Sequence, residues 1–347
     1  MMLETIGQGC SLVRTVRSLL ETPARSNSHK ILICVVFVVE KNHKARDTII
    51  TFACSDLKFL GGLVDKGGKL MKHTEGTFLS VRDTKIYFQS WLPEGDIKAA
   101  VLIAHGINEH SGRYMNVVNH LVPLGYGVYG YDHIGHGKSE GERVFVRKFE
   151  DYTETLNIYL QKVKVEQPDK PVFLIGHSMG GMISCYFLLD HSEEFRGAIM
   201  SGPVITIPEN SKNLPVPVGK VLSKLIPKVR IMKIDANGIS RDPKVVKAFL
   251  DDPLVFKGRT PLQSMLEMLN GMIRINQEME KISLPLFILH GSEDPIISPE
   301  GSNDLFHRAG SEDKTLKIYE GLFHEPFNEP EHKMVLSDVA AWLDERL

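Results

Sequence analysis

The sequence feature that most constrains the fold is the run PVFLIGHSMGG at residues 171–181. Apolar side chains lead into Gly176 and Gly180, which enclose Ser178, and a helix-forming segment follows at once. The two glycines permit a turn too tight for side chains, so the serine is expected to project from the edge of a sheet. The first N–H groups of the following helix point to the same place and favour negative charge there. A serine in this strand–turn–helix setting is predicted to be a nucleophile.

Short apolar strands alternate with helix-length segments over most of the chain after residue 77. This alternation predicts an α/β fold in which a mostly parallel sheet is covered by helices on both faces. The expected strands, of which the first two form a hairpin, are Thr77–Val81, Ile86–Trp91, Ala99–Ala104, Val128–Tyr131, Val172–Ile175, Ala198–Ser201, Leu286–Leu289 and Leu316–Tyr319. The expected helices lie around Asn116–Leu124, Phe149–Glu166, Gly180–Leu189 and Glu300–Arg308.

One long interval interrupts this alternation and divides the chain. Residues 204–283 separate two expected strands by far more than a crossover needs, and their prolines divide the interval into short helices. We interpret the interval as a helical cap, or lid, inserted between two parts of an α/β core at 73–203 and 284–347. Residues 1–72, which contain a glycine-rich connection at 61–68, are interpreted as an N-terminal extension of unknown role.

The last expected helix of the cap begins near Pro261 and carries apolar residues at helical spacing. Packing against the body of the protein is the plain interpretation of this stripe. The alternative is that some of its members, among them Met265 and Met272, line an apolar substrate channel, because methionine adapts to irregular apolar ligands.

A nucleophilic serine needs a base that is oriented by an acid, and in this fold the chain order is Ser, Asp or Glu, then His. Asp294 and His324 each follow one of the last two expected strands, so both should lie with Ser178 at the carboxyl edge of the sheet. Glu293 is the rival acid. Asp294 is preferred because an Asp-Pro pair after a strand favours a turn.

Acyl transfer also requires two N–H donors that bind the developing oxyanion. One is expected from the backbone of Met179, the residue after the nucleophile, and the other from the loop after the strand Ala99–Ala104, where Ile107 is the candidate.

Composition excludes several other classes of protein. With 41 basic and 43 acidic residues, the net charge of −2 removes the electrostatic case for nucleic-acid binding. The cysteine distribution fits a reducing compartment, and a cytoplasmic location is expected. The longest apolar run, Ile31–Val39, is too short to span a membrane and is interpreted as a buried strand, with a lipid-dipping segment as the alternative. Neither zinc-ligand spacing nor a dinucleotide motif is present, so we expect no metal and no cofactor.

Several motifs follow one another in the second part of the chain: HGINEHSGRY at 105–114, YDHIGHGKSEGE at 131–142, GHSMGG at 176–181, SRDP at 240–243 and KTLKIYEG at 314–321. Together they resemble the monoacylglycerol lipase and lysophospholipase group of α/β-hydrolases, over roughly residues 73–347. The resemblance implies a mostly parallel sheet of about eight strands with an inserted helical cap. It also implies a serine esterase that hydrolyses carboxylic esters of single-chain lipids, monoacylglycerol above all. Such an enzyme is expected either to be soluble or to contact a membrane or micelle surface transiently as a peripheral protein.

The same resemblance implies that Glu109 and Arg113 help to form the polar pocket for the glycerol end of the substrate. Relatives can carry a second histidine three residues after the catalytic one, where this chain has Phe327. A lysophospholipase or a broad carboxylesterase therefore stays open as an alternative, as do a peptidase similar to proline iminopeptidases and a non-catalytic hydrolase-like binding protein.

Overall fold

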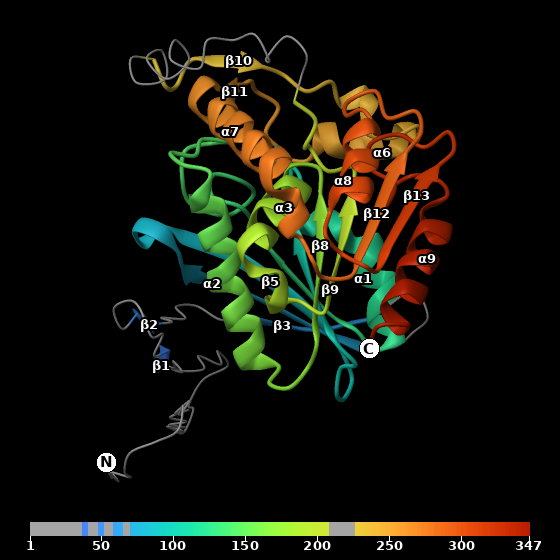
Figure 1. The fold of residues 1–347 in the computed structure, drawn as a ribbon. Helices are drawn as coiled ribbons and strands as arrows, with labels where there is room; N and C mark the ends of the chain where they lie inside the picture. Colours follow the sequence, from blue (N-terminus) through green and yellow to red (C-terminus); the bar gives the residue numbers. More distant parts are fainter. Residues whose placement is uncertain (1–36, 41–47, 52–57, 65–69, 208–225) are drawn as a thin grey trace.

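The computed structural model describes residues 37–40, 48–51, 58–64, 70–207 and 226–347. In this part of the chain, nine strands form one sheet in the order β13-β12-β9-β8-β6-β7-β5-β4-β3. Helices cover both faces of the sheet (Figure 1). The α/β fold class predicted from the sequence is confirmed. None of the described helices combines the length and the apolar character that a membrane-spanning segment needs.

The large sheet has a parallel part and an antiparallel edge. Neighbouring strands from β13 through β6 to β7 pair in parallel, whereas β5, β4 and β3 extend the sheet in antiparallel pairs. The first two expected strands form the predicted hairpin, as β4 and β5. The strands are β3 (Lys58–Val64), β4 (Leu70–Leu79), β5 (Lys85–Pro93), β6 (Ala100–Ala104), β7 (Gly127–Tyr131), β8 (Val172–His177), β9 (Gly197–Ser201), β12 (Leu286–Gly291) and β13 (Lys314–Tyr319).

The two faces of the sheet belong to two apolar cores. Leu102 of β6 faces the core that includes residues of α2, α3 and α8, whereas Val101 and Ile103 face the core that includes α1 and α9. Successive strand residues point to opposite faces, so a strand buried on both sides is apolar throughout. The helices over the sheet are α1 (Met115–Leu121), α2 (Glu150–Glu166), α3 (Met179–His191), α8 (Glu300–Arg308) and α9 (His332–Asp344).

The helix expected over residues 116–124 ends earlier in the structure. α1 stops at Leu121, and a short 3-10 segment, η3 (Val122–Leu124), follows. Pro123 has no N–H with which to continue an α-helix, and Gly125 closes the segment at φ 95°, in the left-handed region. The other 3-10 segments are η1 (Val81–Asp83), η2 (Ser111–Tyr114), η4 (Ser192–Glu194), η5 (Ala236–Gly238) and η6 (Met279–Lys281).

The antiparallel edge of the sheet begins inside the segment that the sequence marks as an extension. β4 starts at Leu70 and pairs with β3, so the sheet crosses the boundary expected at residue 73. Gly61 and Gly62, taken from the sequence as part of a flexible connection, lie in β3 beside a register shift. Glycine inside a strand often marks such an irregularity. The division of the chain into an extension and a core stays a prediction.

The remaining N-terminal expectations lie largely outside the described residues. Of the apolar run Ile31–Val39, residues 37–39 belong to β1 (Phe37–Glu40), which pairs antiparallel with β2 (Thr48–Thr51). The cysteines at positions 10, 34 and 54 are also outside the described ranges. Cys185 is buried and has a free thiol.

The interval 204–283, for which we keep the name cap, follows β9 and precedes β12, and residues 208–225 of it are not described. Its described residues lie at the end of the molecule toward which β12 and β13 point (Figure 1). α7 starts directly after Pro261, as the sequence predicts, and packs its Met272 and Ile275 into the core that it shares with α3. The described elements of the cap are β10 (Arg230–Met232), η5, α6 (Pro243–Asp251), β11 (Thr260–Pro261), α7 (Leu262–Glu278) and η6.

Candidate active site

The turn between β8 and α3 holds Ser178 in a conformation that is rare for a non-glycine residue. Its φ is 55° and its ψ is −118°, which places it among strained backbone conformations that cluster at functional sites. Gly176 and Gly180 are required because neighbouring atoms lie too close to their Cα atoms to leave room for a side chain. A Cβ atom at Gly180 would lie 2.0 Å from the carbonyl oxygen of Ala104, and one at Gly176 would lie 2.5 Å from the Ser184 hydroxyl. The packing therefore demands the G-x-S-x-G pattern.

The structure brings Ser178, His324 and Asp294 together at the carboxyl edge of the sheet. Nε2 of His324 lies 2.9 Å from the hydroxyl oxygen of Ser178, and Nδ1 lies 2.6 Å from Oδ2 of Asp294. Ser178 and His324 are each 5% exposed. This geometry suits proton transfer from the serine to an imidazole that a carboxylate orients.

Asp294 is held as a charged group by several donors. Its Oδ1 accepts hydrogen bonds from the backbone N–H groups of Ile296 and Ile297. Burial alone would raise its pKa, but hydrogen bonds from His290, His324 and Ile297 outweigh burial and hold the pKa well below its usual range. The neighbouring Glu293 is exposed, and it is Asp294 that bonds to Nδ1 of the histidine.

His290 is a site residue that sequence reasoning missed. Its Nε2 lies 3.0 Å from Oδ2 of Asp294, and its Nδ1 lies 2.7 Å from the hydroxyl of Ser302. The side chain is fully buried. It is the second-last residue of β12 and lies four residues before Asp294, and that position close to a candidate acid was the signal available in the sequence.

The two expected oxyanion donors belong to segments that adjoin the serine. Met179 is the first residue of α3 and follows Ser178 directly. Ile107 follows Gly106 in the loop after β6, and a Cβ atom at Gly106 would lie 3.3 Å from Cβ of Ser178. The Gly106–Ile107 peptide therefore passes beside the serine, where the expected role requires it.

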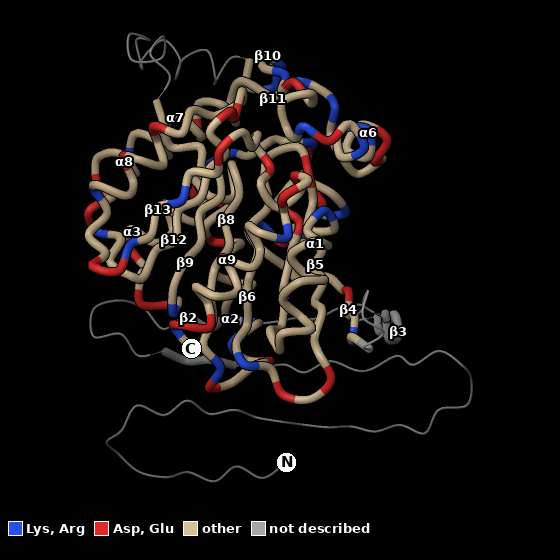
Figure 2. The backbone as a smooth tube through the Cα atoms, turned by 90° about the vertical axis from the view of Figure 1, so that its right-hand side faces the viewer, with Lys and Arg blue, Asp and Glu red and all other residues tan. Residues whose placement is uncertain are grey.

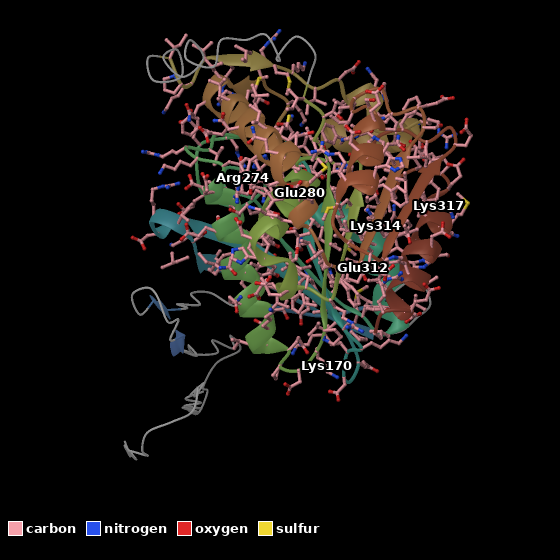
Figure 3. All side chains as sticks on the ribbon, viewed as in Figure 1. Lys170, Arg274, Glu280, Glu312, Lys314 and Lys317 are labelled. Atoms are coloured by element: carbon pink, nitrogen blue, oxygen red, sulfur yellow. The ribbon has the colours of Figure 1, made fainter. Side chains whose placement is uncertain are left out.

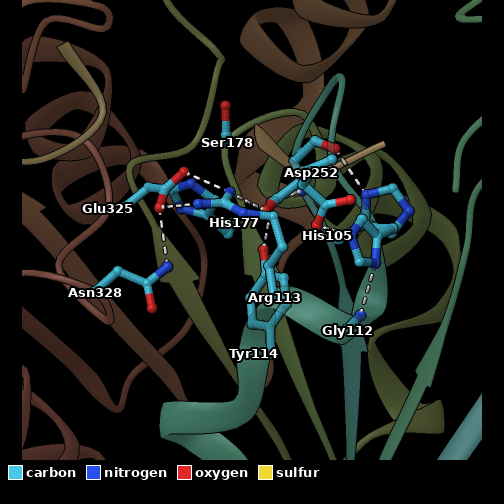
Figure 4. A network of polar contacts seen from close by, with 12 residues as sticks. His105, Gly112, Arg113, Tyr114, His177, Ser178, Asp252, Glu325 and Asn328 are labelled. Atoms are coloured by element: carbon cyan, nitrogen blue, oxygen red, sulfur yellow. Dashed lines mark hydrogen bonds and ion pairs between the residues drawn. The ribbon is translucent and has the colours of Figure 1, made fainter. Parts of the chain in front are cut away.

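Glu109, Arg113 and Glu325 form a buried ionic network next to the serine (Figure 4). Arg113 donates to Glu109 at 2.6 Å and to both carboxylate oxygens of Glu325 at 2.7 and 2.8 Å. Glu109 also accepts hydrogen bonds from the N–H of Gly106 at 2.6 Å and from the hydroxyl of Tyr114 at 2.8 Å. The network thus joins the loop after β6 to the loop that carries His324.

The two carboxylates of this network differ in their electrostatic environment. Burial raises the pKa of Glu109, and the negative charge of Glu325 acts in the same direction against the attraction of Arg113. At Glu325 burial also opposes ionisation, but the charge and hydrogen bonds of Arg113 outweigh it and lower the pKa. Glu325, which directly follows His324 and was not singled out from the sequence, is therefore the firmly ionised partner of the arginine.

The cap contacts both of these loops. The N–H of Phe256 donates to the carbonyl oxygen of Asn108 at 2.9 Å, and Nε2 of His110 lies 2.9 Å from Oδ2 of Asp252. On the other side, the N–H of Glu325 donates to the carbonyl oxygen of a cap residue, Ile239, at 2.8 Å. Residues 239–256 are therefore fixed to the loop after β6 and to the His324 loop.

Comparison with known proteins assigns the fold and the motifs to a family. Residues 95–331 match the model of the serine aminopeptidase S33 family, Hydrolase_4. The chain belongs to this family. Its relatives include the monoacylglycerol lipase of Mycolicibacterium smegmatis, 36% identical over 270 residues, which are 78% of this chain and 96% of that protein. The monoglyceride lipase of Mus musculus is 34% identical over 265 residues, 76% of this chain and 88% of that protein.

A solved structure gives the same result for the fold. The crystal structure of the Paleococcus ferrophilus monoacylglycerol lipase matches with a TM-score of 0.68 and 29% sequence identity. The match covers 76% of this chain and 99% of the lipase chain. The resemblance to monoacylglycerol lipases that the sequence motifs indicate is confirmed.

The expected substrate contacts are Glu109 and Arg113, from the family resemblance, and Met265 and Met272, from the apolar stripe of the last cap helix. Glu109 and Arg113 are already occupied by protein partners. Met272 is 8% exposed within the core, and Met265 is half-buried. Phe327, which stands where relatives can carry a second histidine, is buried in the core beside α1 and α9.

A cavity of about 380 Å³ lies between the loop after β6 and the cap. Its walls include Asn108, Phe249, Phe256 and Lys257. The side chain of Asn108 is 4% exposed, and its Oδ1 has no hydrogen-bond partner within the described ranges.

Proposed function

We propose that this member of the family hydrolyses carboxylic esters of single-chain lipids, with monoacylglycerol as the preferred substrate and fatty acid and glycerol as products. The observation that carries the proposal is the arrangement of Ser178, His324 and Asp294 at a nucleophile elbow in a chain whose relatives are named monoacylglycerol lipases. Other enzymes of this fold act on different acyl compounds, so the relatives supply the substrate class and the geometry supplies the chemistry.

In the proposed reaction, the hydroxyl oxygen of Ser178 attacks the acyl carbonyl carbon while Nε2 of His324 accepts its proton. Asp294 keeps the proton of His324 on Nδ1 and stabilises the imidazolium. The N–H groups of Ile107 and Met179 bind the oxyanion. His324 then protonates the departing alcohol, which leaves an acyl-enzyme, and a water molecule activated by the same histidine releases the fatty acid.

Glu109, Arg113 and Glu325 have a supporting role in this proposal. Glu109 accepts a hydrogen bond from the Gly106 N–H, and Arg113 donates to Glu325. The network therefore fixes the position of the loop after β6 relative to the loop that carries His324. The acyl chain is proposed to run along α7, past Met265 and Met272. The protein would meet its substrate at a membrane or micelle surface as a peripheral protein, and no step of the reaction requires a cofactor.

A peptidase is the second candidate, because the description of the matching family names a serine aminopeptidase. A triad of this kind serves amides as well as esters. A lysophospholipase or a broad carboxylesterase is a variant of the first candidate, and it draws support from the buried Phe327 at a position where relatives can carry a histidine.

The decisive experiment compares kcat/KM for mono-, di- and triacylglycerols of one acyl length, with a lysophospholipid, a short-chain ester and an aminoacyl amide in the same panel. We expect monoacylglycerol to be cleaved fastest, and the activity to disappear in Ser178→Ala. Each buried methylene contributes up to about 0.8 kcal/mol, so four more carbons raise kcat/KM by roughly one-hundredfold while the channel is long enough. Equal rates on all three glycerides would contradict a single-chain site, and preference for the amide would establish the peptidase.

A further inference from the structure

One end of the cap carries a dense group of positive charges. Three segments form this surface, which we call the basic cap face: residues 142–148, 226–233 and 257–263. They contain eight exposed lysines and arginines and one carboxylate, on a chain with a net charge of −2. In Figure 2 several Lys and Arg positions lie around β10 and β11 at one end of the molecule. The cations are Arg143, Arg147, Lys148, Lys228, Arg230, Lys233, Lys257 and Arg259.

Hydrogen bonds hold the three segments together as one surface. The N–H of Leu262 donates to the carbonyl oxygen of Val229 at 2.7 Å, and the Arg259 guanidinium donates to that of Ile231 at 2.9 Å. The Gln263 amide donates to the carbonyl oxygen of Arg147 at 3.0 Å, which ties the first segment to the start of α7. The arrangement of charges is therefore set by the fold of the cap.

Large apolar side chains stand among these cations. Ile226, Val229 and Ile231 are 43%, 45% and 41% exposed. They alternate with basic residues in the sequence IPKVRIMK at 226–233. The one carboxylate of the surface, Glu142, is paired with Lys228 at 2.7 Å. Apolar groups close to cations that outnumber the carboxylates match a surface that offers both negative charge and hydrocarbon.

We propose that the basic cap face docks this protein on lipid bilayers that contain anionic lipid, with the cations at the phosphate level and the three apolar side chains between the head groups. The inference builds on the proposed lipid hydrolysis and names the surface that makes the membrane contact. Since the cap lies at the carboxyl ends of the parallel strands, such docking presents the end of the molecule that carries Ser178 to the bilayer (Figure 1).

The test uses the full chain and two matched triple variants that each remove one arginine and two lysines. The first, Arg147→Gln with Lys148→Gln and Lys233→Gln, removes cations of the basic cap face whose side chains make no hydrogen bond or ion pair among the described residues. The control is Lys98→Gln with Lys170→Gln and Arg196→Gln. These three precede β6, β8 and β9 and so lie at the opposite end of the sheet, where Figure 3 labels Lys170.

Binding is measured by flotation with vesicles of phosphatidylcholine alone and of phosphatidylcholine with phosphatidylserine. The unchanged chain and the control should bind the anionic vesicles strongly and the neutral ones weakly. The cap-face variant should lose roughly one-hundredfold in affinity for the anionic vesicles, because attraction to such a surface adds up over the cations near it. Added salt should weaken the binding.

The proposal would be overturned by equal binding to neutral and anionic vesicles, or by an equal loss in both triple variants. Binding of the cap face to an acidic polypeptide with no binding to either vesicle would also overturn it, in favour of a protein partner. Hydrolysis of a short-chain soluble ester, measured in parallel, should be the same in both triple variants. If the chain binds anionic vesicles selectively but cleaves no lipid ester, the proposed function fails while the docking surface stands.

Discussion

Acidification should unfold this protein through a group of buried neutral histidines. His105, the first residue after β6, packs its ring with those of His133 and His136, and His177 lies beside His324. Burial lowers the pKa of His133 to about 3, of His136 to about 4 and of His177 to about 3, and it lowers that of His105 in the same direction. In the unfolded chain each of these histidines has its ordinary pKa of about 6.5.

The sign and size of the effect follow from proton binding. Between about pH 6.5 and pH 4 these histidines bind protons in the unfolded chain but not in the folded chain. The free energy of unfolding therefore falls as the pH falls. At about pH 5.5 each such histidine favours the unfolded state by roughly 1.4 kcal/mol. The three histidines with stated values together remove roughly 4 kcal/mol, which is a large part of the stability of an ordinary domain. Above about pH 7 these histidines are neutral in both states, and the free energy of unfolding is not reduced by them.

The measurement is urea unfolding followed by far-UV circular dichroism from about pH 7.5 to about pH 5.5. The variant His136→Asn should reduce the slope of unfolding free energy against pH by up to about 1.4 kcal/mol per pH unit, and His307→Asn, which removes an exposed histidine, should leave the slope unchanged. A free energy of unfolding that stays constant over this range would refute the reasoning, because it would mean that these histidines take up protons in the folded state.

The remaining predictions concern the site. Ser178→Ala and His324→Ala should each lower kcat by about 10⁴-fold or more, with little further loss in the double variant, because the residues act as a unit; additive losses in steady-state assays would contradict this. Asp294→Asn should cost about 10⁴-fold in kcat, whereas its exposed neighbour should tolerate Glu293→Gln, and similar losses in both would reject the assignment of the acid. Glu325→Gln should lower the free energy of unfolding by about 3 kcal/mol, since it leaves a buried arginine poorly compensated, and a neutral result in urea unfolding would contradict the buried network.

The parallel strands and the triad could be predicted because their signals are local. A strand buried on both faces is a short apolar run, and the elbow is five consecutive residues whose glycines are required by contacts of 2.0 and 2.5 Å. Asp294 and His324 needed only the rule that loops after parallel strands meet at one edge of the sheet. The sequence therefore contained enough information to predict that Ser178, Asp294 and His324 lie together.

The buried network could not be predicted in the same way. The contact between Arg113 and Glu325 joins residues 212 positions apart, and nothing in either segment shows that the two loops meet. An arginine and a glutamate near a candidate site are equally consistent with substrate contacts, which is how the family resemblance led us to interpret Arg113. Gly61 and Gly62 are a second example, because glycine serves both flexible connections and irregular strands, and only the pairing with β4 distinguishes them.

The fixation of residues 239–256 to both loops of the site limits how this cap can be exchanged with that of a relative. A chimera that replaces the whole interval 204–283 would remove the partners of Asn108, His110 and Glu325, and the loops beside Ser178 would lose their supports. A chimera that retains 239–256 keeps these supports in place. Within one insertion, then, residues 239–256 support the loops beside Ser178, whereas α7 packs against the core and bonds to the segment at 146–149.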